Sequence, residues 1–461
     1  SICLMGNPHA LWTGPSAMRS PLPARAVVAA GQVRAACRPA ARVAAAQADV
    51  YDVRRFGATG DGVTKDTAAV QAAIDAAARA GGGEVRIPAG RYVCGTLYLR
   101  SNVEVEVGAG ATVEASKDEA DYNRWDFCPQ NNRSLAENTN GGHLIVCLEQ
   151  TNVVLRGAGT IDGNGVYFMT NGYDASRVGK RTGPNGFGEA NPQDAIRWRP
   201  AQMLWFCESS RIRLEGLRVH NAPYWSVLLI GCDHVAVRGL EIATSRRSPH
   251  VMNGDGLNID CCRHVRVSDC DIDTSDDSLC LRATGKRLLR APRETADVAV
   301  ANCLLSSNAE AFRIGVGDGP ISDCVFANCV IRESERGINF SATWFPERGC
   351  DFRNIRFDNI VSRTRSSFLR IHRLRGTDSE VEGLHFSNIS GTQGEPSYIW
   401  SRKGKPFRNI SLVNVSMDKG VEVVNVEGFR LEGGTLRRIE LSAQDNERRS
   451  GEIERFERLL Y

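Results

Sequence analysis

The stretch VRVSDCDI, residues 265–272, holds the pattern that decides the fold. Apolar residues stand at its first and third positions, Asp269 stands at the fifth, and apolar residues return at the sixth and eighth. Alternation with a period of two is typical of a β-strand that buries one face. Asp, Asn and Gly tolerate the left-handed backbone conformation, so we expect Asp269 to form a one-residue bend between two short strands.

The same pattern recurs along the second half of the chain, with starts separated by 23 to 33 residues. Its copies are IRLEGLRV (212–219), VAVRGLEI (235–242), VRVSDCDI (265–272), VAVANCLL (298–305), CVFANCVI (324–331), IRFDNIVS (355–362), LHFSNISG (384–391) and ISLVNVSM (410–417). Their fifth positions hold Gly216, Gly239, Asp269, Asn302, Asn328, Asn359, Asn388 and Asn414. A strand, a bend and a strand in every repeat are what a parallel β-helix requires. We therefore predict an all-β, single-stranded parallel β-helix of roughly ten coils, stacked about 4.8 Å apart.

Both ends of such a solenoid need a cap, because the terminal coils have no neighbour on one side. The segment KDTAAVQAAIDAAARAGGG, residues 65–83, predicts a helix that begins at Asp66 or Thr67 and stops at Gly81–Gly83. We expect this helix to cover the N-terminal end. The segment NERRSGEIERFERLLY, residues 446–461, predicts a short helix at the other terminus.

The chain is predicted to have three parts. Residues 1–48 form a targeting or disordered segment, residues 49–435 form the β-helix catalytic domain, and residues 436–461 form a C-terminal cap or tail. Two long polar insertions, 116–142 and 163–200, lie between the first coils. Long loops on a rigid scaffold commonly carry function.

Composition restricts the possible partners. The chain has 461 residues, 42% of them hydrophobic and 24% charged, which is ordinary for a globular protein with a large core. The formal charge is +3, but residues 1–48 hold five arginines and no acid, so the remainder carries −2. A near-neutral body gives no electrostatic basis for binding nucleic acid. No run approaches the roughly 18 apolar residues that a membrane span needs.

The N-terminal segment and the cysteines bear on the compartment. Residues 1–48 are rich in Ala, Arg and Pro, and the small residues of AAAQADV, residues 44–50, suit a signal-peptidase site. We expect a secreted or periplasmic protein, while an Arg-rich, acid-poor segment also fits an organellar transit peptide. The 15 cysteines include no C-x-x-C pair, so a zinc ribbon and a thioredoxin motif are excluded. Most are expected to be small buried hydrophobic residues.

Two adjacent carboxylates in DTSDDSLCL, residues 273–281, are the strongest functional signal. Asp276 follows Asp255 by 21 residues, which is close to one coil, so we expect Asp255, Asp276 and Asp277 to converge on one outer patch. Neighbours in a strand point to opposite faces, and a buried charge is costly, so a bend must present both outward. Clustered carboxylates raise a pKa, and a protonated acid beside ionised ones is what glycosidic hydrolysis requires. Solvated turn residues, or Ca²⁺ ligands between coils, are the alternatives.

These motifs resemble glycoside hydrolase family 28, the polygalacturonase family, with its pectin-lyase-like right-handed parallel β-helix. NGDGLNID (253–260) and TSDDSLCLRA (274–283) are similar to the family's Asn-x-Asp and Asp-Asp motifs. The segment VYDVRRFGATGDGVTKDTAAVQAAIDAAARAGGGEVRIPAGRY (50–92) resembles the N-terminal capping region shared by the family and the wider β-helix group. The segment NAPYWSVLLIGCDHVAVRGLEI (221–242) resembles the coil before the active site.

The resemblance implies an inverting glycosidase that acts on a cell-wall polysaccharide or oligosaccharide, the pectin type first. Asp276 would be the general acid that protonates the leaving oxygen, and Asp255 and Asp277 would activate water on the opposite side. Inverting enzymes hold acid and base about 6.5–9.5 Å apart to admit that water. No cofactor or metal, a polysaccharide or oligosaccharide partner and a monomeric chain are expected.

Two positions depart from the family pattern. In NAEAFRIG (308–315), Glu310 stands where the family has the histidine of Gly-His-Gly. In RGINFS (336–341), Asn339 and Ser341 stand where an Arg-x-Lys pair grips a uronate carboxylate. Neither side chain replaces that charge. The sugar is therefore neutral at that subsite, or an arginine on another coil supplies the cation. The candidates for that cation are Arg282, Arg313, Arg336 and Arg370.

Further side chains are candidates for substrate binding. The predicted substrate-binding set is Asn253, Glu310, Arg282, Arg313, Asn339 and Trp225. Glu310 either raises the pKa of Asp276, binds sugar hydroxyls or is a plain turn residue. Trp225, Tyr224 and Trp344 either stack on sugar rings or pack within the fold. His250 and His264 are interpreted as surface or turn residues.

Two other functions remain open. A pectate-lyase-like eliminase or a uronan epimerase needs a base, usually assisted by a cation, next to a uronate carboxylate; the missing cations at positions 339 and 341 argue against it. A non-catalytic carbohydrate-binding β-helix with a decayed site is the other alternative.

Overall fold

The computed structural model describes residues 50–131, 141–171, 198–246, 251–284, 288–292, 294–341, 349–372, 378–442 and 444–445. The chain divides into two units, Ser1–Gln47 and Ala48–Tyr461, and every described element belongs to the second. The predicted targeting segment and the predicted helix over 446–461 lie outside the described residues. Within the described part, no helix combines the length and the apolar character needed to cross a membrane.

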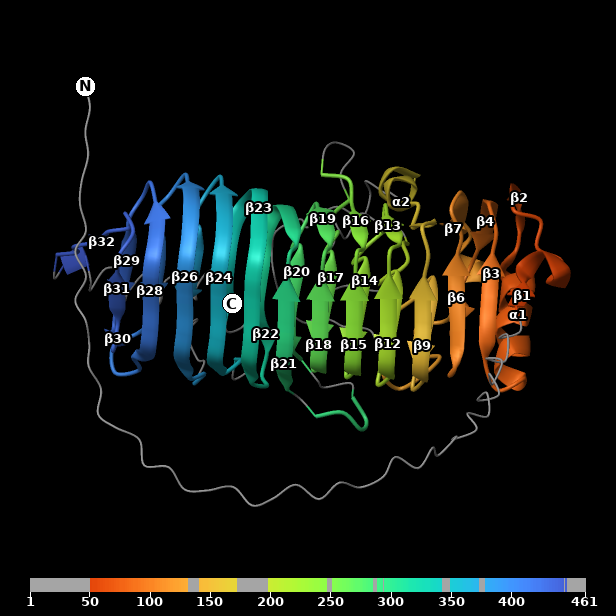
Figure 1. Ribbon diagram of the computed structural model, residues 1–461, viewed down its shortest axis with the longest axis horizontal. Helices are drawn as coiled ribbons and strands as arrows, with labels where there is room; N and C mark the ends of the chain where they lie inside the picture. Colours follow the sequence, from red (N-terminus) through yellow and green to blue (C-terminus); the bar gives the residue numbers. More distant parts are fainter. Residues whose placement is uncertain are drawn as a thin grey trace, which may run out of the picture. The chain divides into compact units, whose positions relative to one another are not determined.

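The second unit is a right-handed parallel β-helix, as predicted, in which three parallel sheets run side by side along the stack of coils (Figure 1). The first sheet contains β1 (Val50–Asp52), β3 (Gly83–Ile87), β6 (Val103–Val107), β9 (Thr151–Arg156), β12 (Ser210–Glu215), β15 (Asp233–Arg238), β18 (Arg263–Ser268), β21 (Thr295–Ala301), β30 (Val426–Glu427) and β31 (Arg430–Glu432). The second contains β2 (Asp61–Lys65), β4 (Gly90–Cys94), β7 (Ala111–Ala115), β10 (Thr160–Asp162), β13 (Arg218–His220), β16 (Glu241–Ala243) and β19 (Asp271–Thr274).

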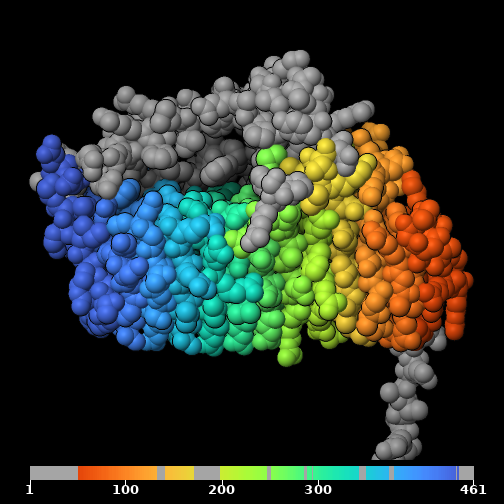
Figure 2. Space-filling view, turned by 90° about the horizontal axis from the view of Figure 1, so that it is seen from above, coloured from red at the N-terminus to blue at the C-terminus, as the bar shows by residue number. Residues whose placement is uncertain are grey.

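The third sheet contains β5 (Leu97–Tyr98), β8 (Ile145–Leu148), β11 (Leu204–Cys207), β14 (Val227–Ile230), β17 (Leu257–Asp260), β20 (Leu279–Ala283), β25 (Leu369–His372), β27 (Ser397–Trp400), β29 (Val421–Val424) and β32 (Arg438–Ile439). In the later coils the chain bends from sheet to sheet without a break in β22 (Leu304–Gly317), β23 (Ile321–Ser341), β24 (Phe352–Thr364), β26 (Val381–Gln393) and β28 (Phe407–Met417). Figure 2 shows successive coils as adjacent bands in chain order.

The predicted one-residue bends are confirmed. All eight residues at the fifth position of the repeat have φ between 52° and 73°, which is the left-handed region. Each separates a strand segment of the first sheet from one of the second. Several of their side chains form a ladder along the outside, since Asn359 Nδ2 donates to Asn328 Oδ1 at 2.8 Å and Asn414 Nδ2 to Asn388 Oδ1 at 2.8 Å. The residue type at the fifth position of the repeat therefore indicates the left-handed backbone conformation there.

A second column of left-handed bends was not predicted. The residue just before each repeat also has a positive φ, between 51° and 68°. These residues are Arg211, His234, His264, Asp297, Asp323, Asn354, Gly383 and Asn409. The later members are of the residue types that favour this conformation, but Arg and His in the earlier coils hid the column from sequence reading.

The apolar core lies between the three sheets. Phe326 and Phe357 stack at a centroid distance of 4.3 Å, and Phe357 stacks on Phe386 at 5.5 Å. Of the 13 cysteines among the described residues, all but Cys128 are buried, as expected.

The helix α1 (Thr67–Arg79) begins where it was predicted to begin, with Asp66 as its N-cap residue. The remaining helices are α2 (Gly165–Asn171), η1 (Val53–Phe56) and η2 (Glu119–Asp121). Asp66 makes no side-chain capping bond; its carboxylate instead accepts from the backbone amides of Thr59 and Gly60 at 2.7 and 3.1 Å. This acid therefore attaches the preceding loop to the cap.

Candidate active site

Strand register stacks four charged residues just before the third-sheet strands, a place called here the entrance of the third sheet. Leu257 pairs with Leu279, Leu279 with Phe312, and Phe312 with Ile338. The residue two places before each of these four occupies the same position on consecutive coils. These residues are Asp255, Asp277, Glu310 and Arg336. The coil between the first two is 22 residues long, from Leu257 to Leu279, so Asp277, rather than Asp276, lies directly beside Asp255.

The predicted bend at the acidic pair is present. The strand β19 ends at Thr274 and β20 begins at Leu279, so Asp276 and Asp277 are not part of a regular strand. The hydroxyls of Thr274 and Ser307 donate to the backbone carbonyl of Asp276 at 2.7 and 2.6 Å. The amide of Asp277 donates to Asp276 Oδ1 at 3.0 Å. The bend is therefore held in place by hydrogen bonds within its own coil and by one from Ser307 on the next coil.

Asp255 is almost completely buried, and its contacts to donors within the described part of the chain are long. Its Oδ2 accepts from Asn258 Nδ2 at 3.3 Å, and it lies 3.9 Å from Cys280 Sγ and 4.0 Å from Arg282 Nη2. Burial raises the pKa of Asp255 well above its ordinary value, and the charge of Asp276 adds to the rise, which the arginines only partly oppose. Asp255 is therefore a carboxyl group with a strong tendency to hold a proton.

Asp277 is buried but has a charged partner. Arg313 Nε contacts Asp277 Oδ2, Arg313 Nη2 lies 3.4 Å from Oδ1, and the amide of Glu310 donates to Oδ1 at 3.2 Å. Burial raises the pKa of Asp277; Arg313 opposes the rise, and the charges of Glu310 and Asp276 add to it.

The pKa of Asp276 is also raised, by burial first and with a further contribution from Glu310, while Arg313 opposes the shift. The three carboxyl groups therefore share at least one proton more readily than separate acids would.

Glu310 is saturated with donors and is not a plain turn residue. Arg313 Nη2 lies 2.9 Å from Oε2, while Arg336 Nε and Asn339 Nδ2 each lie 2.8 Å from Oε1. Burial acts to raise the pKa of Glu310, but the two arginines outweigh it and the pKa is lowered. Glu310 is therefore an ionised anchor for Arg313, Arg336 and Asn339.

Two of the predicted arginines cover aromatic rings. The Arg282 guanidinium lies 4.1 Å from the centroid of Trp225, and the Trp225 ring stacks on Tyr224 at 5.4 Å. Trp225 is only 4% exposed, so the ring contacts protein rather than an open surface. Arg370, which pairs with Asn339 in the next coil, contacts the Tyr398 hydroxyl and lies 5.0 Å from that ring.

Not every predicted residue joins this group. Ser341 is buried and lies beside His372 on the next coil. His264 lies in the first sheet, 2.7 Å from Asp233, and takes no part in the carboxylate cluster. His250 and Trp344 lie outside the described residues, as do 132–140 and 172–197 of the two insertions.

Arg199 is a site residue that sequence reasoning missed. Its Nη2 donates to Asn253 Oδ1 at 3.0 Å, and its Nη1 donates to the carbonyls of Met252 and Pro223 at 2.7 and 3.0 Å. Burial lowers the pKa of Arg199 to about 10, against the opposing charges of Tyr224, Asp255 and Asp276. Arg199 lies in a long insertion without periodicity, so only the fold brings it to Asn253.

Known proteins share this sequence pattern and this fold. The model of glycosyl hydrolases family 28 matches residues 83–420. A probable polygalacturonase from Vitis vinifera is 27% identical over 236 residues, which is 50% of this chain and 43% of that protein. Mannuronan C5-epimerase AlgE2 from Azotobacter vinelandii is 56% identical over 68 residues, 13% of this chain and 7% of that protein.

The chain thus spans less than half the length of these two curated relatives. Among solved structures, a hyperthermoactive exopolygalacturonase from Thermotoga maritima aligns with a TM-score of 0.61 at 20% identity, covering 85% of this chain and 90% of that one. A structural likeness at this identity supports the fold.

Proposed function

The chain belongs to glycosyl hydrolases family 28, and from this membership we propose that it hydrolyses glycosidic bonds of a cell-wall polysaccharide of the pectin type, or of an oligosaccharide derived from one. The observation that carries the proposal is the register that sets Asp255 beside Asp277, with Asp276 on the adjoining bend. Three carboxyl groups with raised pKa values at one entrance can supply both a proton and a base.

In the proposed mechanism Asp276 is the general acid. Asp276 differs from Asp255 and Asp277 in its exposure: it is half-buried on the bend, which leaves it accessible to substrate, whereas the other two are buried. Its raised pKa allows it to carry the proton, as one of three carboxyl groups that share at least one proton. Asp276 gives its proton to the glycosidic oxygen as the bond to the anomeric carbon breaks. Asp255 and Asp277 take a proton from a water molecule, and the oxygen of that water attacks the anomeric carbon from the opposite face. The product has the inverted configuration.

Neighbouring side chains position Asp255 and Asp277, the two carboxylates that act as the base. Arg313 contacts both Asp277 and Glu310, so Glu310 holds the guanidinium that orients Asp277. On the other coil, Asn258 and Arg282 face Asp255. A buried guanidinium between two carboxylates is directional and has little freedom to move. Arg313 and Glu310 are therefore proposed as positioning residues.

A uronate carboxylate is proposed to meet cations on later coils. Arg313 is committed to two carboxylates, and Arg282 is buried over Trp225. Arg336 keeps 25% of its side chain exposed, and Arg370 is half-buried one coil further. These two supply the positive charge that Asn339 and Ser341 lack. This arrangement supports a pectin-type sugar over a neutral one.

We also propose that the protein is secreted or periplasmic and acts as a monomer. A polysaccharide substrate too large to enter a cell supports the first part. A single chain whose described residues already assemble all three carboxyl groups supports the second.

The test is the Asp276→Asn variant, assayed on polygalacturonic acid and its oligomers with the product anomer followed by NMR. We expect the wild type to release the inverted anomer and the variant to lose activity by a factor of about 10²–10⁴, the usual contribution of a general acid. Asp273→Asn is the matched control, because Asp273 lies on the same coil but pairs with Arg246 at 2.9 Å on the second sheet. Unchanged hydrolysis by Asp276→Asn would remove the acid assignment, and retention of configuration would remove the mechanism.

A further inference from the structure

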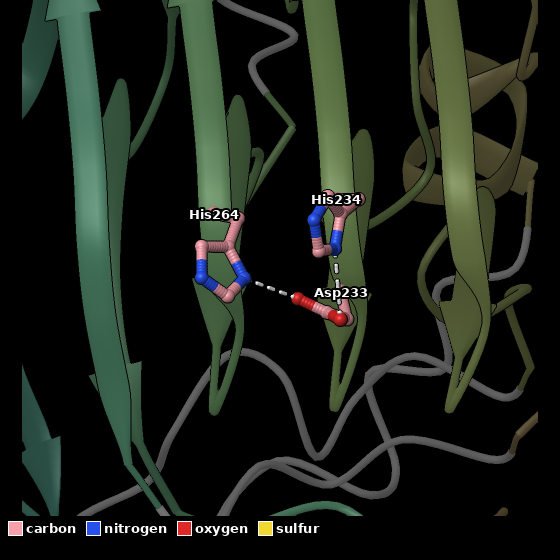
Figure 3. A group of neighbouring side chains, drawn as sticks. All are labelled: Asp233, His234 and His264. Atoms are coloured by element: carbon pink, nitrogen blue, oxygen red, sulfur yellow. Dashed lines mark hydrogen bonds and ion pairs between the residues drawn. The ribbon is translucent and has the colours of Figure 1, made fainter.

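A cluster of two imidazoles and one carboxylate lies on the first sheet, separate from the carboxyl groups at the entrance of the third. Asp233 and His234 belong to β15 and His264 to the neighbouring strand β18. Figure 3 shows the two rings side by side, with the carboxylate of Asp233 below them and in contact with both. Asp233 Oδ2 lies 2.9 Å from His234 Nδ1, and Oδ1 lies 2.7 Å from His264 Nδ1.

Backbone conformation brings the two rings together. Val235 pairs with Val265, so the residues just before them, His234 and His264, occupy equivalent positions on consecutive coils. Both have the left-handed backbone, with φ of 55° and 53°. Their ring centroids are 4.5 Å apart as a result. Later coils meet the same backbone requirement with Asp, Asn or Gly, so the conformation alone does not call for imidazole.

The donor set suits a transition-metal ion. One ligand atom from each of Asp233, His234 and His264 lies within 4.8 Å of the other two. Two imidazole nitrogens and one carboxylate oxygen are ligands that zinc-class ions prefer.

The surroundings add the features of a metal site. Asp297 Oδ2 lies 3.8 Å from His264 Nε2, the ring nitrogen on the far side from Asp233, where a carboxylate can orient a ligating histidine. The side chains of Asp233, His234 and His264 are each about half exposed, so water can complete the coordination.

We propose that Asp233, His234 and His264 bind one divalent first-row transition-metal ion of the zinc class, which bridges two consecutive coils of the β-helix. The ion links β15 to β18 outside the core and stabilises this part of the solenoid. The site is independent of the proposed glycosidase activity.

The test is a calorimetric titration of the full chain with ZnCl₂ at about pH 7.5, where an ordinary imidazole is neutral. The wild type is expected to bind one equivalent of Zn²⁺ more than His234→Asn and His264→Asn. Asn keeps the left-handed bend, as it does in later coils, so these variants should fold. Asp297→Asn should weaken Zn²⁺ binding about tenfold or more without abolishing it.

His220→Asn is the matched control, because His220 is another surface histidine beside a carboxylate, Glu241 at 3.0 Å, and among the described residues no second imidazole pairs with it. It should bind Zn²⁺ like the wild type, and ZnCl₂ should raise the melting temperature of both. Equal binding by wild type and His264→Asn would overturn the proposal. Equal loss in His220→Asn would also overturn it, since adsorption to any surface histidine would then explain the signal.

Discussion

At Asp255, stability and the proposed activity make opposite demands on one side chain. The carboxyl group is 3% exposed, yet its donors are distant, at 3.3 Å from Asn258 and 4.0 Å from Arg282. A buried carboxylate that is not fully paired costs free energy when it ionises. The same burial gives the group the raised pKa that a proton-transferring site requires. Function and stability therefore make opposite demands on this residue.

A pH-dependent gain in stability is expected for Asp255→Asn. The pKa of Asp255 is raised in the folded state, so ionisation of this carboxyl group destabilises the fold. Its contribution to stability is fully present below the ordinary carboxyl pKa and is lost as the pH rises through the folded-state pKa. Asn cannot ionise, so the variant should exceed the wild type by about 1–3 kcal/mol near pH 7. The gain should shrink toward zero near pH 4. Calorimetric melting at several pH values measures it.

Asp273→Asn is the control for this gain. Asp273 is half-exposed and paired with Arg246, so its removal should leave stability nearly unchanged or slightly lower at neutral pH. An Asp255→Asn variant less stable than the wild type at pH 7 would contradict the argument.

At the scale of the element, two left-handed residues in each coil turn the chain. In the first sheet one column lies at the second residue of β12, β15 and β18, and the other directly follows their last residues, with φ of 51°–73° at the repeat positions of both. Because each bend takes a single residue, strands of five or six residues can alternate with almost no loop. Asn is favoured because its side chain can also bond to the neighbouring coil, as Asn359 does with Asn328.

Replacements of Asn359 test this account. Ala must adopt a left-handed backbone that costs an ordinary residue about 1–2 kcal/mol, whereas Gly adopts it freely. We expect Asn359→Ala to unfold at lower urea concentration than Asn359→Gly. The order should reverse at Arg356, an exposed strand residue three positions earlier, where Gly is the less stable replacement. The same order at both positions would show that backbone conformation does not decide stability at the bend.

At the scale of the whole molecule, the N-terminal end of the β-helix depends on its cap. Val70, Ala73, Ile74 and Ala77 of α1 are fully buried, and α1 contacts β1, β3 and η1. Figure 1 shows α1 beside the first strands of the stack. Without such a cover, the apolar interior and the unpaired strand edges of the first coil would face water and other chains.

Ile74→Asp should uncover this end. A charge among the buried residues of α1 would displace the helix, and exposed strand edges should then pair between molecules. We expect soluble oligomers or aggregates by size-exclusion chromatography with light scattering, together with a lower melting temperature. Ala68→Asp is the matched control, since Ala68 is exposed in the first turn of the same helix, where an acid is favourable. Normal behaviour of Ile74→Asp would contradict the capping role.

The fold was largely predictable because its signals are local. Strand alternation and left-handed bends are properties of single residues and their immediate neighbours, so eight copies of one pattern predicted the β-helix. The second column of bends was missed, because Arg211, His234 and His264 are not the usual residues for that backbone. The three aspartates were identified from their motifs, but not the order in which they stack.

The sequence by itself determined the β-helix, the position of its cap and the set of carboxyl groups. Tertiary structure decided that Asp277 lies beside Asp255, that Glu310 and Arg313 hold it, and that Arg199 reaches Asn253. The physical reason is that coil length varies, from 22 residues between Leu257 and Leu279 to 33 between Leu279 and Phe312. A shift of one residue changes which side chains meet, and the pairing of backbone groups across coils, rather than any local preference, sets that register.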